Sequence, residues 1–62
     1  MERLLRIREV ASQTGLSAAE IYRRMKAGTF PLSLRLGPQQ VRWIESRVQA
    51  WIAARISEQE VA

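Results

Sequence analysis

The sequence of 62 residues predicts a mainly α-helical fold, with three helices and one small β-hairpin between the second and the third helix. Two observations support this fold class. Apolar residues recur at helical spacing in three segments, and the first two segments end at a glycine. Between the second and third segments, apolar and polar residues alternate on both sides of a Gly-Pro turn, which is typical of paired strands. A chain of this length forms one small core, so we expect a single domain over residues 1–62.

A short apolar stretch at residues 4–7 indicates a strand or an extended lead-in, and the first helix follows from about Ile7 to Thr14. Within this helix, apolar positions recur at i, i+3, i+4 and i+7, which produces one apolar face. Gly15 is expected to end the helix, because glycine adopts the left-handed backbone conformation at little cost.

The second helix begins with the clearest local signal in the chain. Ser17 and Glu20 have capping-box spacing, in which the serine hydroxyl accepts from the Glu20 amide and the Glu20 carboxylate accepts from the Ser17 amide. Leu16 and Ile21 flank this cap as a hydrophobic staple. Gly28 is the expected end of the helix.

Residues 32–36 and 41–43 alternate apolar and polar side chains with period two, and the four residues 37–40 between them have turn chemistry. These segments predict a two-stranded β-hairpin. We expect the core-facing side chains to be Leu34, Leu36, Val41 and Trp43. We expect the side chains on the opposite face to be Arg35 and Arg42.

The third helix is expected from about Glu45 to Ile56, although a second capping-box sequence at residues 46–49 leaves its start open. Its apolar stripe comprises Ile44, Val48, Trp51, Ile52 and Ile56. We interpret this stripe as part of the core; the alternative is a surface for a protein partner. Residues 57–62 are mostly polar and predict a frayed tail.

The composition argues against catalysis. The chain has no cysteine and no histidine, and all six of its acidic residues are glutamate. It therefore lacks a Cys/His nucleophile pair, a Ser-His-Asp triad and a zinc or iron site, and its three glycines form no phosphate-binding loop. We expect no enzyme activity, no cofactor and no metal. The first residues, Met-Glu-Arg-Leu-Leu-Arg-Ile, are too few and too charged for a signal peptide, and no run of about 18 apolar residues occurs for a membrane span. We therefore expect a cytoplasmic protein.

The positive charge is unevenly distributed. Ten basic and six acidic residues give a formal net charge of +4, and between Ile21 and Trp43 there are five basic residues and no acid. A cationic region of this kind favours a polyanionic partner, because each neutralised phosphate releases counterions. The alternative is a solvated surface that only keeps the protein soluble.

The first two helices have the spacing of a DNA-binding helix-turn-helix. This motif needs a small residue where the helices cross, a glycine in the turn and an apolar residue facing inward on the second helix. Ala11, Gly15 and Ile21 occupy these positions. With the hairpin as a wing, the predicted fold is a winged helix-turn-helix.

Two residues depart from this pattern. Thr14 stands where a larger aliphatic side chain is usual, and Arg24 stands where the second helix turns inward. Either the stem of Arg24 follows the rim of the core, or a small rotation of the helix buries Met25 in its place.

In the docked geometry of this motif, the second helix, about residues 17–27, lies in the major groove. Its outward side chains are Ser17, Ala18, Ala19, Tyr22, Arg23 and Lys26. The two alanines allow close approach to thymine methyl groups, and Arg23 is the candidate for bidentate guanine readout. Tyr22 offers a hydroxyl to a phosphate or a base, and Lys26 holds a phosphate. Alternatively, Tyr22 packs its ring against the hairpin and Lys26 only complements the helix dipole.

The hairpin, about residues 34–43, then serves as a wing on the minor groove or the DNA backbone. Its candidate contact residues are Arg35, Gln39, Gln40 and Arg42. The glutamine amides at the tip suit hydrogen bonds to either partner. The alternative role of the two arginines is to keep an exposed strand edge from aggregating.

The sequence resembles the AlpA-type phage regulatory proteins over about residues 3–56, through a set of short segments in one collinear order. The similar segments are residues 5–10, 14–17, 21–23, 28–31, 36–38, 43–46 and 48–52. Arg24 departs from an apolar residue expected in that family, and Ala18-Ala19 replaces a more polar pair. The resemblance implies a small MerR-like winged helix, as in phage excisionases, whose second helix and wing contact DNA.

The resemblance and the charge pattern together predict a sequence-specific double-stranded DNA-binding regulator of a prophage or integrated element. One alternative is an excisionase-type recombination directionality factor that bends DNA. Another is a protein-interaction adaptor that acts through the third helix. The expected partners are double-stranded DNA, a second copy on an adjacent DNA site, and an integrase or RNA polymerase, and the expected location is the cytoplasm, at the nucleoid.

Overall fold

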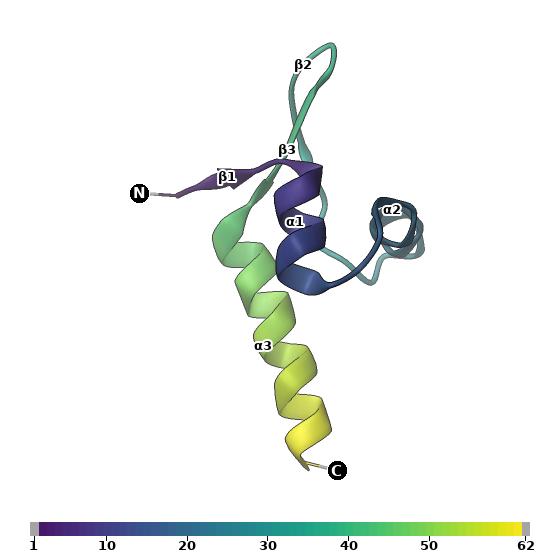
Figure 1. Ribbon diagram of the computed structural model, residues 1–62, viewed down its shortest axis with the longest axis vertical. Helices are drawn as coiled ribbons and strands as arrows, with labels where there is room; N and C mark the ends of the chain where they lie inside the picture. The colour runs from purple at the N-terminus through teal and green to yellow at the C-terminus, as the bar shows by residue number, and fades with distance from the viewer. Residues whose placement is uncertain (1, 62) are drawn as a thin grey trace.

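The computed structural model describes residues 2–61 and has three helices and a small antiparallel sheet (Figure 1). In chain order, the elements are β1 (Leu4–Leu5), α1 (Ile7–Thr14), α2 (Ala18–Ala27), β2 (Leu34–Gly37), β3 (Gln40–Ile44) and α3 (Glu45–Val61). The predicted fold class, mainly helical with a hairpin wing, is confirmed.

The sheet has the strand order β1-β3-β2. The lead-in strand β1 pairs with the last residues of β3, with Leu4 opposite Ile44 and Leu5 opposite Trp43. Pairing with β1 therefore anchors the base of the β2–β3 hairpin. The tip of the hairpin extends away from the helices, and α3 extends in the opposite direction along the longest axis of the molecule (Figure 1).

The core lies where the helices meet the base of the hairpin. Its buried side chains are Leu5, Val10, Ile21, Phe30, Trp43 and Val48. Partly buried side chains that pack against them are Ile7, Ala11, Leu16, Met25, Val41, Trp51 and Ile52. The apolar faces predicted for α1 and α2 are thus the faces that form the core.

The bounds predicted for α1 and the end predicted for α2 are confirmed. Gly15 has φ 76° and its amide donates to the Ala11 carbonyl oxygen at 2.8 Å. Gly28 ends α2 with φ 80°. The Ser17 hydroxyl accepts from the Glu20 amide at 3.1 Å, which is one half of the predicted capping box; the Glu20 carboxylate instead pairs with arginines of its own helix.

The two departures from the helix-turn-helix pattern are accommodated locally. The Thr14 hydroxyl donates to the Val10 carbonyl oxygen at 2.8 Å and accepts from the Leu16 amide at 3.3 Å. Its polar group is thereby satisfied in the turn. Arg24 is half-buried, with its guanidinium over the Trp51 ring, and Met25 packs against the core.

The hairpin forms as predicted, but the two faces predicted for it are wrong. Leu34 pairs with Arg42, and Arg35 pairs with Val41. Because directly opposed residues share a face of the sheet, the two arginines lie on opposite faces. A register that differs by one residue exchanges the faces of a strand, and alternation within one strand does not reveal the register. Of the expected core side chains, Trp43 is buried and Val41 packs against the core.

The tip of the hairpin also differs from the prediction. Gly37 pairs with Gln40, so the turn is tighter than the expected four-residue loop, and the ladder is irregular between Arg35 and Gly37. Leu36 lies at this irregularity and is 54% exposed, and Leu34 is exposed as well. The prediction that these two leucines face the core is therefore wrong. Leu34 shares the face of Arg42, opposite to Val41, and Leu36 lies where the ladder is irregular.

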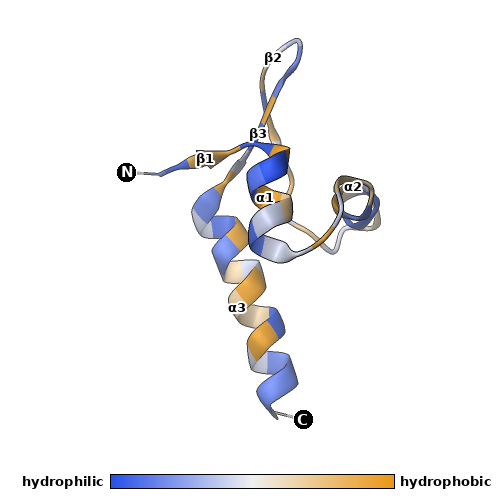
Figure 2. Cartoon of the chain, viewed as in Figure 1, coloured by the Kyte–Doolittle hydropathy of each residue, from blue (hydrophilic) through white to orange (hydrophobic). Residues whose placement is uncertain are grey.

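The third helix begins at Glu45, without use of the capping-box sequence at residues 46–49, and continues to Val61. The tail expected at residues 57–62 is thus helical as far as Val61, and residue 62 lies outside the described residues. Glutamate, glutamine and alanine are good helix formers, and Arg55 pairs with Glu58 one turn ahead. Figure 2 shows the apolar residues in the middle of α3 and a hydrophilic C-terminal end.

The apolar stripe of α3 is core for only part of its length. Val48 is buried, and Trp51 and Ile52 pack against the core. Ile56 is exposed and is not among the residues that pack against the core. Core packing therefore accounts for the stripe as far as Ile52.

Candidate functional site

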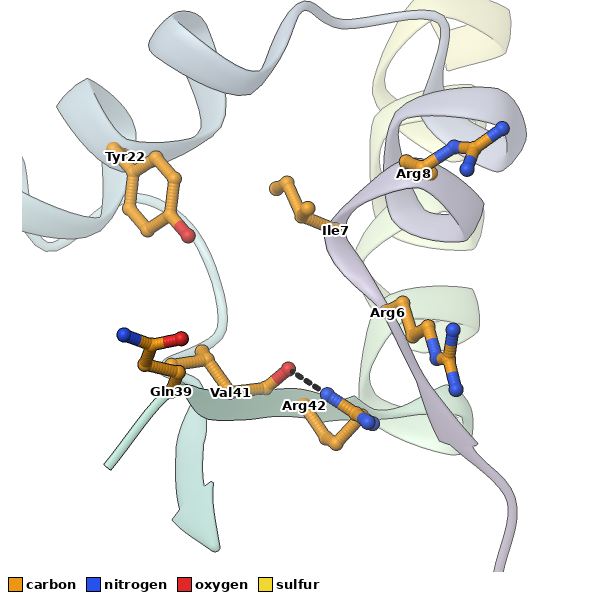
Figure 3. A pocket seen from close by; sticks show the side chains of 7 residues that line it. All are labelled: Arg6, Ile7, Arg8, Tyr22, Gln39, Val41 and Arg42. Atoms are coloured by element: carbon orange, nitrogen blue, oxygen red, sulfur yellow. Dashed lines mark hydrogen bonds between the residues drawn. The ribbon is translucent and has the colours of Figure 1, made fainter. Parts of the chain in front are cut away.

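A surface hollow of about 460 Å³ lies between the start of α1, the middle of α2 and the strand β3 (Figure 3). Its lining residues are Arg6, Ile7, Arg8, Tyr22, Gln39, Val41 and Arg42. Within residues 2–61, no acidic side chain lines this hollow. The hollow joins segments far apart in the sequence, because β1 and α1 both lie against β3.

Tyr22 forms the α2 side of the hollow. Its ring contacts Trp43 edge to face, with 6.0 Å between ring centroids and an interplanar angle of 60°. Tyr22 nevertheless remains 47% exposed, and its hydroxyl points into the hollow (Figure 3). Packing of the ring against the hairpin and exposure of the hydroxyl, predicted above as alternatives, therefore occur together.

Basic side chains form the opposite side. Arg6 and Arg8 come from the lead-in and first turn of α1, and Arg42 comes from β3, where its guanidinium donates to the Val41 carbonyl oxygen at 2.9 Å. In Figure 3, the guanidinium groups of Arg6 and Arg8 extend away from Tyr22 toward the outer rim. Among the ion pairs within residues 2–61, none involves Arg6, Arg8 or Arg42.

Arg6 and Arg8 were not among the candidate site residues predicted from the sequence. The helix-turn-helix motif places DNA contacts on the second helix and the hairpin, and both arginines lie outside these segments. The available signal was their spacing of two residues at the start of a helix. This spacing indicates a site only when the pairing of β1 with β3 is also known, because that pairing brings the start of α1 beside β3.

The predicted contact residues of α2 lie on its solvent side. The exposed residues of this set are Ser17, Ala18, Ala19, Tyr22, Arg23 and Lys26. Ile21, in contrast, is buried on the core side of the helix. Arg23 pairs with Glu20, which lies one turn earlier in the helix. Lys26 has no ion pair among the described residues.

The predicted contact residues of the wing do not all gather at one place. Gln39 and Arg42 line the hollow, whereas Arg35 and Gln40 are exposed outside its lining. Arg35 lies on the other face of the hairpin from Arg42, for the register reason given above. The hairpin therefore offers two basic faces and not one.

Glu9 is the acidic residue nearest in sequence to this basic rim. Its carboxylate accepts from the Arg6 backbone amide at 2.9 Å and from the Arg3 guanidinium at 2.9 Å. The hydrogen bond from the Arg6 amide is the largest cause that lowers the pKa of Glu9, and the positive charges of Arg3 and Arg6 add to it against desolvation. Arg3 also contacts Glu45 at 3.3 Å, so the acids beside the rim are engaged within the fold.

Within residues 2–61, the structure has neither a carboxylate cluster suited to a metal ion nor a helix suited to a membrane. No three carboxylate side chains there lie close enough together to share a metal ion. None of the helices in the same range combines the length and hydropathy that crossing a bilayer requires.

The sequence matches the family described as "Prophage CP4-57 regulatory protein (AlpA)" over residues 3–56. It is also 45% identical over 56 residues to a protein of Enterobacteria phage P4 named "Uncharacterized protein ORF88", a match that covers 90% of this chain and 64% of that protein. The chain thus spans less than two thirds of the length of this relative. No solved structure matches the chain significantly. With a family match over most of its length, the chain belongs to the AlpA family of prophage regulatory proteins.

Proposed function

We propose that this chain is a sequence-specific double-stranded DNA-binding domain that regulates a prophage or integrated element. In this proposal α2 enters the major groove, and the β2–β3 hairpin lies on the minor groove or the backbone. The observation that carries it is the lining of the hollow, which combines arginines at its outer rim with the Tyr22 hydroxyl and Gln39 and, within residues 2–61, includes no acidic side chain. Phosphate groups are the ligands that such a set of donors suits.

The outer face of α2 supports base contact. Its first turn presents Ala18 and Ala19, whose small side chains let the helix approach base edges and thymine methyl groups. Arg23 follows on the same solvent side with a side chain that is 75% exposed, so it is the candidate for guanine readout. Lys26, one turn on, is placed for a phosphate.

Phosphate contacts are assigned to both sides of α2. Arg6, Arg8 and Arg42 surround the hollow on one side, and Lys26 and Arg35 are exposed elsewhere on the helix and the wing. If about five phosphates are neutralised, the logarithm of the binding constant falls with the logarithm of salt concentration with a slope of about −4 to −5.

The test begins with selection of preferred duplexes from a random pool, followed by titration of the best duplex and a scrambled one at several salt concentrations. Arg42→Ala should weaken binding to both duplexes similarly, whereas Arg23→Ala should reduce the preference for the selected duplex. Arg47→Ala is the matched control, because Arg47 is an exposed arginine of α3 outside the proposed surface. Absence of duplex binding, or binding that does not depend on salt, would refute the proposal.

A bending activity, as in excision, is favoured by one specific observation. Leu36 is exposed at the tip of the wing, next to Arg35, and apolar side chains beside basic ones can insert between base steps and kink the minor groove. Fluorescence transfer between dyes at the two ends of the selected duplex reports such a bend. Leu36→Ser should reduce the bend and retain most of the phosphate contacts; an unchanged duplex shape in both proteins would exclude this second function.

A further inference from the structure

Arg24 makes a set of contacts that the proposed DNA interface does not use. Its Nε donates to the Glu20 carboxylate at 3.0 Å, and its guanidinium lies over the Trp51 ring, 5.8 Å from the ring centroid. The Trp51 ring is itself held in place. Its Nε1 donates to the Thr29 carbonyl oxygen at 2.8 Å, and its ring makes a T-shaped contact with the Phe30 ring, with 4.9 Å between the ring centroids. Arg24 is thus stacked on a ring that is fixed to the core.

Glu20 connects this anchored arginine to an exposed one. One carboxylate oxygen of Glu20 accepts from Arg24, and the other pairs with Arg23. The side chains of Glu20 and Arg24 are 25% and 37% exposed, whereas the side chain of Arg23 is 75% exposed. The Glu20 amide is also held, since it donates to the Ser17 hydroxyl.

Such a connection matters for recognition more than for stability. Exposed ion pairs contribute little to folding free energy. A long side chain that must be ordered on binding, however, loses conformational entropy, and holding it in position beforehand reduces that loss. The guanidinium group reads guanine only in one planar, bidentate orientation.

We propose that Glu20 and Arg24, stacked on Trp51, form a tether that positions Arg23 for base readout and so sets sequence discrimination. The inference rests on the proposed function, in which Arg23 contacts a base. Glu20 and Arg24 are positioning residues here and do not contact DNA themselves. The tether also explains why an arginine occupies a position where an apolar side chain was expected.

The negative charge of Glu20 has a second consequence. Glu20 is the acidic residue of α2, and it stands beside a helix face that would approach phosphates. Its charge therefore opposes binding to every duplex alike, while its hydrogen bonds favour the duplex that Arg23 reads. Repulsion of wrong partners combined with attraction of the right one is a general route to specificity.

The experiment compares Glu20→Gln, Arg23→Ala and the double variant on the selected and the scrambled duplex. Glu20→Gln should bind the scrambled duplex more tightly than the parent does, and its discrimination should fall about 2- to 12-fold, the cost of ordering one long side chain on binding. Arg23→Ala should reduce discrimination in the parent protein and reduce it much less in the Glu20→Gln background.

A second pair of variants tests the anchor with a matched control. Arg24→Met keeps an apolar contact with Trp51 and removes the hydrogen bond to Glu20, so discrimination should fall while the salt slope is unchanged. Arg55→Met is the control, because Arg55 also lies over the Trp51 ring, at 5.3 Å, but pairs with Glu58. It should leave discrimination unchanged. Circular dichroism of each variant checks that the fold is retained.

Additive effects of Glu20→Gln and Arg23→Ala on discrimination would overturn the tether and leave the proposed DNA-binding function intact. Equal effects of Arg24→Met and Arg55→Met on discrimination would also overturn the tether and leave the DNA-binding function intact. If Arg23→Ala does not change discrimination in the parent protein, base readout by Arg23 fails, and the tether fails with it.

Discussion

The base and the tip of the β2–β3 hairpin have the same alternation of apolar and polar residues but lie in opposite surroundings. At the base, Trp43 is fully buried and pairs with Leu5 of β1. At the tip, Leu36 is 54% exposed beside an irregularity in the ladder. The difference shows that alternation predicts a strand, whereas cover by other elements decides which apolar side chains are buried.

The two regions therefore differ in what they contribute to the fold. The base belongs to the body, whose six buried side chains come from β1, α1, α2, the segment after α2, β3 and α3. The tip contributes little to that body, and the role proposed for it is contact with DNA. Substitutions at the two ends should then separate folding from binding.

Trp43→Ala should have the largest effect. Removal of a buried tryptophan costs about 3–5 kcal/mol, a large share of the roughly 3–9 kcal/mol expected for a domain of this size. Leu36→Ser is the matched change at the tip and should alter the free energy of unfolding by no more than about 0.5 kcal/mol. Urea denaturation followed by circular dichroism measures both. Similar losses in the two variants would disprove the division between base and tip.

Gly15→Ala should have an intermediate effect on the body. Gly15 has φ +76°, and a Cβ added there would meet nothing within 4 Å. The cost is therefore conformational and not steric, about 1 kcal/mol. Gly15→Asn should cost less, because asparagine tolerates this backbone region. A shift of the urea midpoint measures the difference; equal midpoints for the alanine variant and the parent would contradict the assigned role of Gly15.

Acidification should have the smallest effect, and it acts on the body through Glu9. The pKa of Glu9 is lowered in the fold from its usual value of 4.5, so its ionised form stabilises the folded state above that pH. This stabilisation is lost as the pH falls below 4.5 through the folded pKa. Glu9→Gln should therefore flatten the decline of the melting temperature over this acidic range. A decline identical to that of the parent would rule out this contribution.

Much of the helical part could be predicted because its signals are short-range. The ends of α1 and α2 depend on Gly15, Gly28 and Ser17, which act within a few residues of their own positions. The alternation around the Gly-Pro turn likewise predicts the hairpin, whose strands are adjacent in sequence. These elements follow from local backbone geometry, so the sequence alone is sufficient for them.

The candidate site was predicted only in part. The solvent face of α2 follows from helical periodicity once Ile21 is placed in the core. The approach of Arg6 and Arg8 to β3 does not, because it depends on pairing between β1 and β3, which are separated by most of the chain. Contacts across such distances carry no local signature.

The three helices, the hairpin, the central excess of positive charge and the small core can all be predicted from the sequence. Local hydrogen bonding, turn preference and hydrophobic periodicity act within short segments. The folded chain is needed for three other features: the register that places Arg35 and Arg42 on opposite faces, the exposure of Leu36, and the contact of Arg24 with both Glu20 and Trp51. Those features depend on which segments cover one another, and that is settled by packing of the whole chain.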